Sequence, residues 1–161
     1  MNIVDFLSSA DAMVESRTLD KVQLLRELSA RAAASLQLDP GLVVNAILKR
    51  ESLGSTGMGS GVAIPHARFR DLKKSHGILV RLRKPIDFDA IDGHPVDIVF
   101  LLITPVAPES DQLKALACIA RKLRNPEVIL DLRQAKDGAA VYEAAFNTEA
   151  RVRTGGVTLN D

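Results

Sequence analysis

His66 is the residue whose type and surroundings suit it best to chemistry. It follows a segment with four glycines in eight residues and then a short apolar run that ends in a proline. An imidazole with an ordinary pKa of about 6.5 is largely neutral at pH 7, so one ring nitrogen can attack phosphorus without the help of a strong base. The segment therefore predicts a loop that presents a single imidazole as a nucleophile.

The glycines before His66, at positions 54, 57, 59 and 61, predict an anion-binding loop. Glycine adopts positive φ angles without a steric penalty, so closely spaced glycines allow backbone N–H groups to turn inward and form a nest for an anion. The loop lacks the Gly-Lys-Ser/Thr of a P-loop and the Gly-x-Gly-x-x-Gly of a dinucleotide fold. We therefore expect the anion to be a phosphoryl group carried by the protein itself, with an ordinary glycine-rich turn as the alternative.

Four neighbouring residues supply groups that can stabilise charge on the phosphoryl oxygens. Arg50 can offer a forked guanidinium to two of those oxygens. The hydroxyls of Ser55 and Thr56 and the backbone N–H groups around Gly57 can offer further hydrogen bonds. The alternative for Arg50 is a residue at the rim of a largely apolar helix face, with its stem covering that face.

The composition fits one domain and excludes several classes of function. The 161 residues, 47% of them hydrophobic, suffice for a single substantial core. Aromatic residues make up only 4% and tryptophan is absent, so platforms for stacking nucleic-acid bases are not expected. The net charge of +1 argues against nonspecific binding to nucleic acid or electrostatic attachment to a membrane.

Cysteine content and hydropathy indicate the compartment. The single cysteine, Cys118, excludes an internal disulfide. The sequence has no signal-peptide pattern at its N-terminus and no apolar run of about 18 residues, which a transmembrane helix needs. We expect a cytoplasmic protein without membrane insertion.

Five helices are expected from apolar spacing and from start and stop signals. The clearest start is Asp39-Pro40, which supplies an N-cap followed by proline at the first helical position. Asn125-Pro126 separates two later helices. The predicted helices span residues 19–36, 41–52, 108–123, 126–134 and 137–146.

Residues 77–83 and 97–104 are predicted strands. The second is apolar on both faces, which is typical of a central strand covered by helices on both sides. Lys84-Pro85 and Asp92-Gly93-His94-Pro95 predict turns between them. Residues 3–7 fit either a small strand or a helical turn.

Strands interleaved with helices predict an α/β fold, with a mixed β-sheet flanked by helices on both faces. We expect a single domain over residues 1–147 and a mobile polar tail over residues 148–161.

The pattern Arg50-Glu-Ser-Leu-Gly-Ser-Thr-Gly57 followed by Gly61-Val-Ala-Ile-Pro-His66 closely resembles the phosphorylation-site signature of the mannitol/fructose-type IIA domains of the bacterial phosphotransferase system. Within that group the chain is most similar to the nitrogen-regulatory IIA proteins. The resemblance covers residues from about 3 to about 147.

This resemblance implies an α/β phosphocarrier that needs no cofactor. The histidine matching His66 accepts a phosphoryl group on a ring nitrogen from an HPr-like phosphocarrier, and the arginine matching Arg50 lies beside it. The resemblance also implies regulatory target proteins, such as potassium transport or sensor kinase components.

Gln112 departs from the family pattern. Mannitol-type IIA domains commonly carry a second histidine at the start of the helix after the central strand, and the matching position here is Gln112. It shares a helix face with Leu116, Ile119 and Leu123, so its amide is expected to point inward. The amide can donate to a phosphoryl oxygen or orient an imidazole, but it cannot carry a proton. The alternative is a buried glutamine whose hydrogen bonds the backbone satisfies.

The other titratable candidates are weaker. His76 and His94 are expected to be solvated, and the three histidines lack the short spacing that makes a zinc site convincing, so no metal is expected. Cys118 has no activating neighbour in the sequence and is not expected to be catalytic.

Three hypotheses for function remain. The favoured one is a regulatory phosphocarrier whose phosphorylation state changes what the surface around His66 binds. The second is a IIA component of mannitol/fructose-type sugar uptake that passes its phosphoryl group to a IIB domain. The third is a binding module whose histidine is never phosphorylated.

Overall fold

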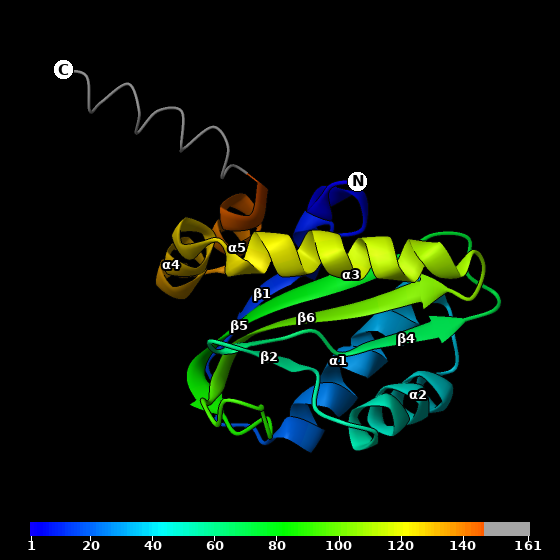
Figure 1. Ribbon diagram of the computed structural model, residues 1–161, viewed down its shortest axis with the longest axis horizontal. Helices are drawn as coiled ribbons and strands as arrows, with labels where there is room; N and C mark the ends of the chain where they lie inside the picture. The colour runs from blue at the N-terminus through cyan, green and yellow to red at the C-terminus, as the bar shows by residue number, and fades with distance from the viewer. Residues whose placement is uncertain (147–161) are drawn as a thin grey trace.

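The computed structural model of the chain describes residues 1–146, so the tail expected at 148–161 lies outside the described residues. One mixed sheet of six strands forms its centre, in the order β1-β5-β6-β3-β2, with β4 also paired to β6 (Figure 1). The strands are β1 (Ala12–Glu15), β2 (Gly57–Gly59), β3 (Val62–Ala63), β4 (His66–Phe69), β5 (His76–Ile86) and β6 (Val96–Pro105).

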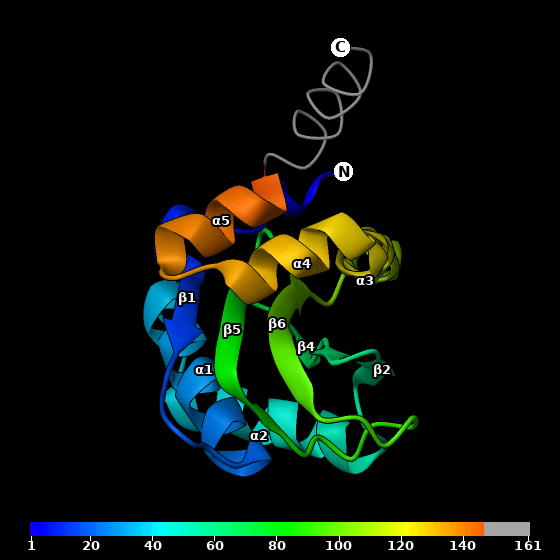
Figure 2. The same ribbon diagram turned by 90° about the vertical axis from the view of Figure 1, so that its left-hand side faces the viewer.

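Five α-helices cover the sheet within the described residues. α1 and α2 pack on one face, and α3, α4 and α5 pack on the other, which both views show (Figures 1 and 2). The expected α/β fold, with helices on both faces of a mixed sheet, is confirmed. The helices are α1 (Lys21–Leu36), α2 (Pro40–Ser52), α3 (Glu109–Arg124), α4 (Pro126–Gln134) and α5 (Gly138–Phe146).

β6 is the central strand, as its sequence predicts. Side chains alternate between the two faces of a strand. Ile98, Phe100 and Leu102 enter the core under α3, α4 and α5. The residues between them enter the core under α1 and α2, and these are Val99, Leu101 and Ile103. Because residues 98–103 are all fully buried, β6 reads as a continuous apolar run.

The helix starts follow their caps. The Asp20 side chain accepts a hydrogen bond from the Gln23 N–H at the start of α1, and Gln23 bonds back to form a capping box. Asp39 accepts from the Gly41 N–H before Pro40, as expected for α2. Observed bounds lie within two residues of the predicted ones for all five helices.

Two other local predictions need correction or completion. Lys84-Pro85 is no turn: β5 runs through it to Ile86, and the register with β6 shifts between Arg81 and Ile86. A proline is tolerated there because, where the register shifts, the residue does not have to donate a backbone N–H to the neighbouring strand. Residues 3–5 form a 3₁₀ turn, the helical one of the two alternatives.

The glycine-rich segment forms a β-hairpin and not the expected anion nest. β2 pairs antiparallel with β3, and Gly59 lies opposite Val62. The residues between them, Ser60 and Gly61, have φ angles of 58° and 83°. Two consecutive positive φ angles are what a tight type I′ hairpin turn requires, so Gly61 serves the turn.

Arg133 fastens this hairpin to the rest of the fold. Its guanidinium contacts both Asp97 carboxylate oxygens, at 2.8 and 3.0 Å, and donates to the Ser60 carbonyl at 2.9 Å. A Cβ on Gly61 would lie 2.5 Å from Arg133 Nη2 and 2.9 Å from Asp97 Oδ1. The turn therefore has no room for a side chain.

Gly61→Ala should destabilise the fold more than Gly93→Ala. Gly93 also has a positive φ, 72°, but a Cβ there would meet nothing within 4 Å. Gly93→Ala should therefore lower the free energy of unfolding through backbone strain alone, by about 1–2 kcal/mol. Gly61→Ala adds displacement of Arg133, about 1 kcal/mol more. Urea unfolding measures both, and equal losses would show that the Arg133 contacts contribute nothing.

Candidate functional site

The site lies at the sheet edge formed by β4, between α2 and the start of α3 (Figure 1). A hollow of about 510 Å³ opens there to solvent. It brings together His66, Arg50 and Gln112, as the sequence predicts. Its lining residues are Ala46, Lys49, Arg50, Leu53, His66, Ala67, Arg68 and Gln112.

The pairing of β6 places His66 at this edge. One side of β6 pairs in parallel first with β3 and then with β4, and His66 lies opposite Leu102 as the first residue of β4. Ile64 and Pro65 separate the two short strands, and the Pro65 carbonyl still accepts from the Leu102 N–H at 2.9 Å. The chain therefore keeps the same register along β6 up to the histidine, although the ladder is interrupted at Ile64 and Pro65.

The contacts of the His66 ring distinguish its two nitrogens. Nδ1 lies 2.8 Å from the Ile64 carbonyl oxygen, and because a carbonyl only accepts, Nδ1 carries the proton. Nε2 then keeps a lone pair and accepts from Arg50 Nε at 3.4 Å. A backbone hydrogen bond that fixes the tautomer in this way orients an imidazole for chemistry at its other nitrogen.

The pKa of His66 is lowered, chiefly because burial disfavours the charged imidazolium. The hydrogen bond to Ile64 and the Glu51 carboxylate act in the opposite direction, whereas the Arg50 and Arg68 cations lower the pKa further. The imidazole is therefore neutral at pH 7, the state that nucleophilic attack requires.

Arg50 comes from the last turn of α2 and reaches the ring. Besides the contact with His66, its Nη1 donates to the Gly54 carbonyl at 2.9 Å. Within residues 1–146, its Nη2 has no hydrogen bond, so it can meet an anion at the ring. The guanidinium does more than cover an apolar helix face.

Gln112 faces the hollow and not the core. It is half-buried in the first turn of α3, whereas Ala115, Ile119 and Leu123 of the same helix are buried. The expected inward orientation is wrong in this respect, because the first turn of α3 borders the open site and the later turns pack on the sheet. The amide therefore lines the same hollow as His66.

The three residues expected to bind phosphate do not line this hollow. The Ser55 hydroxyl donates to the Phe88 carbonyl at 2.7 Å and accepts from the Gly57 N–H at 3.0 Å. The Thr56 hydroxyl and N–H both donate to the Glu51 carboxylate. Because these groups already have partners in α2, in their own loop and at Phe88, the structure does not bring them to His66.

Sequence reasoning missed three residues around the site. Lys49 and Arg68 add two cations to the hollow, and Arg68 lies two positions after His66 on the same strand. Glu51 is buried and holds Thr56. A carboxylate in the last turn of a helix opposes the helix dipole, and that unfavourable position is the signal that marks Glu51.

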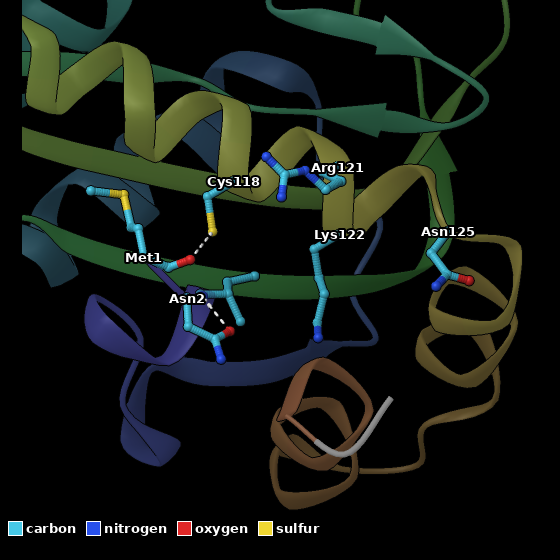
Figure 3. A pocket seen from close by; sticks show the side chains of 7 residues that line it. Met1, Asn2, Cys118, Arg121, Lys122 and Asn125 are labelled. Atoms are coloured by element: carbon cyan, nitrogen blue, oxygen red, sulfur yellow. Dashed lines mark hydrogen bonds between the residues drawn. The ribbon is translucent and has the colours of Figure 1, made fainter. Parts of the chain in front are cut away.

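The remaining histidines and the cysteine lie away from the hollow. The His76 side chain is 19% exposed, with Nε2 3.7 Å from Asp11 Oδ2, and burial lowers its pKa, so the expectation of a solvated residue is wrong. Cys118 lies against the N-terminus, where Sγ donates to the Met1 carbonyl at 3.6 Å (Figure 3). Burial raises the pKa of the thiol, which keeps it protonated and unreactive.

The described residues hold neither a cluster of metal ligands nor a helix that could span a membrane. Residues 1–146 contain no group of three or more His, Cys, Asp and Glu side chains placed to hold a metal ion. No helix among these residues combines the length and apolar character that crossing a membrane requires.

Comparison with known proteins places the chain in a family. Residues 6–147 match the family described as "Phosphoenolpyruvate-dependent sugar phosphotransferase system, EIIA 2". The chain belongs to this family. It is 42% identical over 142 residues to a nitrogen regulatory protein of Bradyrhizobium diazoefficiens. The matched residues cover 88% of this chain and 93% of the relative. A nitrogen regulatory protein of Escherichia coli is 39% identical over 80% of both chains.

Solved structures of IIA proteins share the fold. Nitrogen regulatory protein IIA-Ntr from Neisseria meningitidis superposes with a TM-score of 0.81 at 30% identity, over 89% of this chain and 98% of the other. IIA mannitol from Escherichia coli superposes with a TM-score of 0.67 at 18% identity, over 82% of this chain and 94% of the other. This PTS EIIA type-2 domain is therefore most similar, among these, to the nitrogen-regulatory branch.

An NMR titration of His66 should give a midpoint below 6.5, because burial lowers its pKa. In acid the unfolded chain then binds more protons than the folded chain, and this difference destabilises the fold. The contribution of His66 to the free energy of unfolding is therefore complete above about pH 6.5, the pKa of an unfolded histidine. That contribution is lost as the pH falls through the pKa of His66 in the folded protein. His66→Gln should reduce the loss of stability in that window. A midpoint at or above 6.5 would contradict the assignment of a buried neutral imidazole.

Proposed function

We propose that this IIA domain is a cytoplasmic regulatory phosphocarrier that accepts a phosphoryl group on Nε2 of His66 from a phospho-HPr-like carrier. The observation that carries this proposal is the neutral imidazole, with its tautomer held by Ile64, facing an open hollow beside Arg50. That arrangement presents a lone pair to phosphorus without a base.

In the proposed reaction, the Nε2 lone pair of His66 forms the new N–P bond as the N–P bond to the donor histidine breaks. The donor imidazole leaves with the bonding electrons. His66 keeps its Nδ1 proton, and the Ile64 carbonyl stabilises the resulting positive ring. No water has to be activated, so positioning and charge stabilisation carry the catalysis.

The groups around Nε2 match the charge that develops. Lys49, Arg50 and Arg68 surround the hollow with positive charge, which favours phosphoryl oxygens in a half-buried site. Gln112 is placed to donate from its amide. Ser55, Thr56 and Gly57 would contribute by holding the loop, since their own donors are engaged there.

Exposed leucines beside the site favour a protein donor. Leu53 lines the hollow and is 78% exposed, and Leu113, next to Gln112 in α3, is 69% exposed. Apolar side chains around a charged centre are typical of a protein interface. The same surface would bind regulatory targets, for which the resemblance of the sequence suggests potassium transport or sensor kinase components.

The second candidate is a IIA component of sugar uptake. A fructose-specific EIIA component of the phosphotransferase system of Haloferax volcanii is 29% identical over 149 residues. The higher identity of the nitrogen regulatory proteins, 39% and 42%, favours the regulatory role. A transfer assay from phospho-His66 to a IIB domain separates the two candidates.

His66→Ala should abolish acid-labile, base-stable phosphorylation by a reconstituted phosphoenolpyruvate relay, because it removes the proposed nucleophile. Intact mass spectrometry measures the phosphoryl group directly. His76→Ala and His94→Ala are the matched controls and should be phosphorylated like the natural chain. A phosphorylated His66→Ala protein would place the acceptor elsewhere, and an unphosphorylated natural chain would favour the binding module.

Gln112→His should lengthen the lifetime of phospho-His66 below about pH 7, because a protonated imidazole donates a hydrogen bond of about 1.5–3 kcal/mol, against about 0.5–1.5 for a neutral amide. Gln112→Leu should leave the fold stable and slow phosphorylation. Quenched time courses measure both rates. Wild-type rates in both variants would show that Gln112 does not contact the phosphoryl group.

A further inference from the structure

Glu51 is a buried carboxylate directly after Arg50, and no step of the proposed reaction uses it. Its side chain is 5% exposed. Oε2 accepts from the Thr56 N–H at 2.8 Å and lies 3.0 Å from Lys21 Nζ, and Oε1 accepts from the Thr56 hydroxyl. Both oxygens are therefore engaged, one with a cation from α1 and both with the loop that leaves α2.

These contacts fix the loop that holds Arg50. The chain turns back after α2, and Thr56, five residues past Glu51, is bound to it twice. Within this closed loop the Gly54 carbonyl accepts from Arg50 Nη1 at 2.9 Å. The same guanidinium directs Nε at His66. Glu51 is thus connected to the nucleophile through Thr56, Gly54 and Arg50.

Lys21 extends this connection to a second loop. Besides Glu51, it donates to the Phe88 carbonyl at 3.1 Å and lies 4.7 Å above the centre of the Phe88 ring. The Ser55 hydroxyl donates to the same carbonyl. The carboxylate therefore anchors the 53–56 segment against α1 and Phe88, which leaves the Arg50 guanidinium little freedom.

Stability alone does not account for a charge at this position. Burying an ion pair costs desolvation that the attraction between its charges often only offsets, and apolar side chains of similar volume frequently serve stability as well. A buried charged network does fix one geometry, because any displacement leaves a charge without a partner.

We infer that Glu51 is a positioning residue for phosphoryl transfer, which acts by holding the Arg50 guanidinium against His66 Nε2. This inference rests on the proposed function. Arg50 would meet the phosphoryl oxygens, and Glu51 would determine where Arg50 lies before the donor arrives. Such preorganisation lowers the barrier because no rearrangement is needed during the reaction.

Glu51→Gln tests the inference, since it keeps the shape and removes the charge. The transfer rate from the phospho-donor at saturation should fall about 10-fold, with little change in the KM for the donor, because the loss affects the reacting group and not docking. In an Arg50→Lys background the same substitution should have no further effect, since Glu51 acts through Arg50.

Asp11→Asn is the matched control. Asp11 is also a buried carboxylate, 6% exposed, and it lies 3.6 Å from Arg31 Nε just before β1, at the opposite edge of the sheet from β4. Its substitution should destabilise the fold in urea without changing the transfer rate. If both variants slow transfer equally, Glu51 is a general stabilising residue and the inference is wrong.

An NMR measurement makes the inference testable without phosphorylation. The Arg50 Nε–H resonance should shift and exchange faster with solvent in Glu51→Gln, and it should be unchanged in Asp11→Asn. If the natural chain is not phosphorylated, the proposed function fails, yet this resonance still reports whether Glu51 positions Arg50. An unchanged resonance, an unchanged rate, or additive losses with Arg50→Lys would each overturn the inference.

If Glu51→Gln does not fold, Thr56 supplies a second pair of variants. Thr56→Val removes the hydroxyl that donates to Glu51, and Thr56→Ser keeps it. Thr56→Val should slow transfer and shift the Arg50 resonance, and Thr56→Ser should restore both. The same rate and resonance in the two variants would contradict the role of this contact.

Discussion

The pairing of β6 with two short parallel strands is the constraint on which the site depends. β6 is buried on both faces, and β3 and β4 follow one another along the same side of it. The break between them, at Ile64 and Pro65, leaves the Ile64 carbonyl directed at the ring of His66. One backbone feature therefore places the imidazole at the sheet edge and leaves the free lone pair on Nε2.

Around that nitrogen, burial and the neighbouring cations act on the imidazole in the same direction. Burial keeps the imidazole neutral, and neighbouring cations disfavour its protonation as well, so both prepare the nucleophile. In the proposed function the same cations would attract the phosphoryl group. Arg50 has to serve both purposes from a single position, and that makes its orientation the sensitive variable. A buried carboxylate next to it in the chain is a physical means of fixing that orientation.

Gln112 gives this site a different character from a two-histidine one. A second imidazole would change its charge with pH, whereas an amide donates a hydrogen bond of constant charge. Among the described residues that line the hollow, His66 is then the only one of a type that changes protonation near neutral pH.

The sequence by itself determined the helices, the central strand and the key residues. Caps such as Asp39-Pro40 act within one turn, and a run such as residues 98–103 is buried wherever it packs, so local pattern sufficed. The motif around His66 predicted that this histidine and Arg50 are neighbours, and both line the hollow.

Only the tertiary structure decided the directions of the loop groups. β1 to β4 have two to four residues each, too few to show a period. β1, β3 and β4 pair with the longer strands β5 or β6, and β2 pairs with β3. The glycines became a hairpin turn, and the Ser55 and Thr56 donors turned away from His66 toward Phe88 and Glu51. A hydrogen-bonding side chain pairs with a group that the tertiary fold brings close to it, and the local sequence does not determine which group that is.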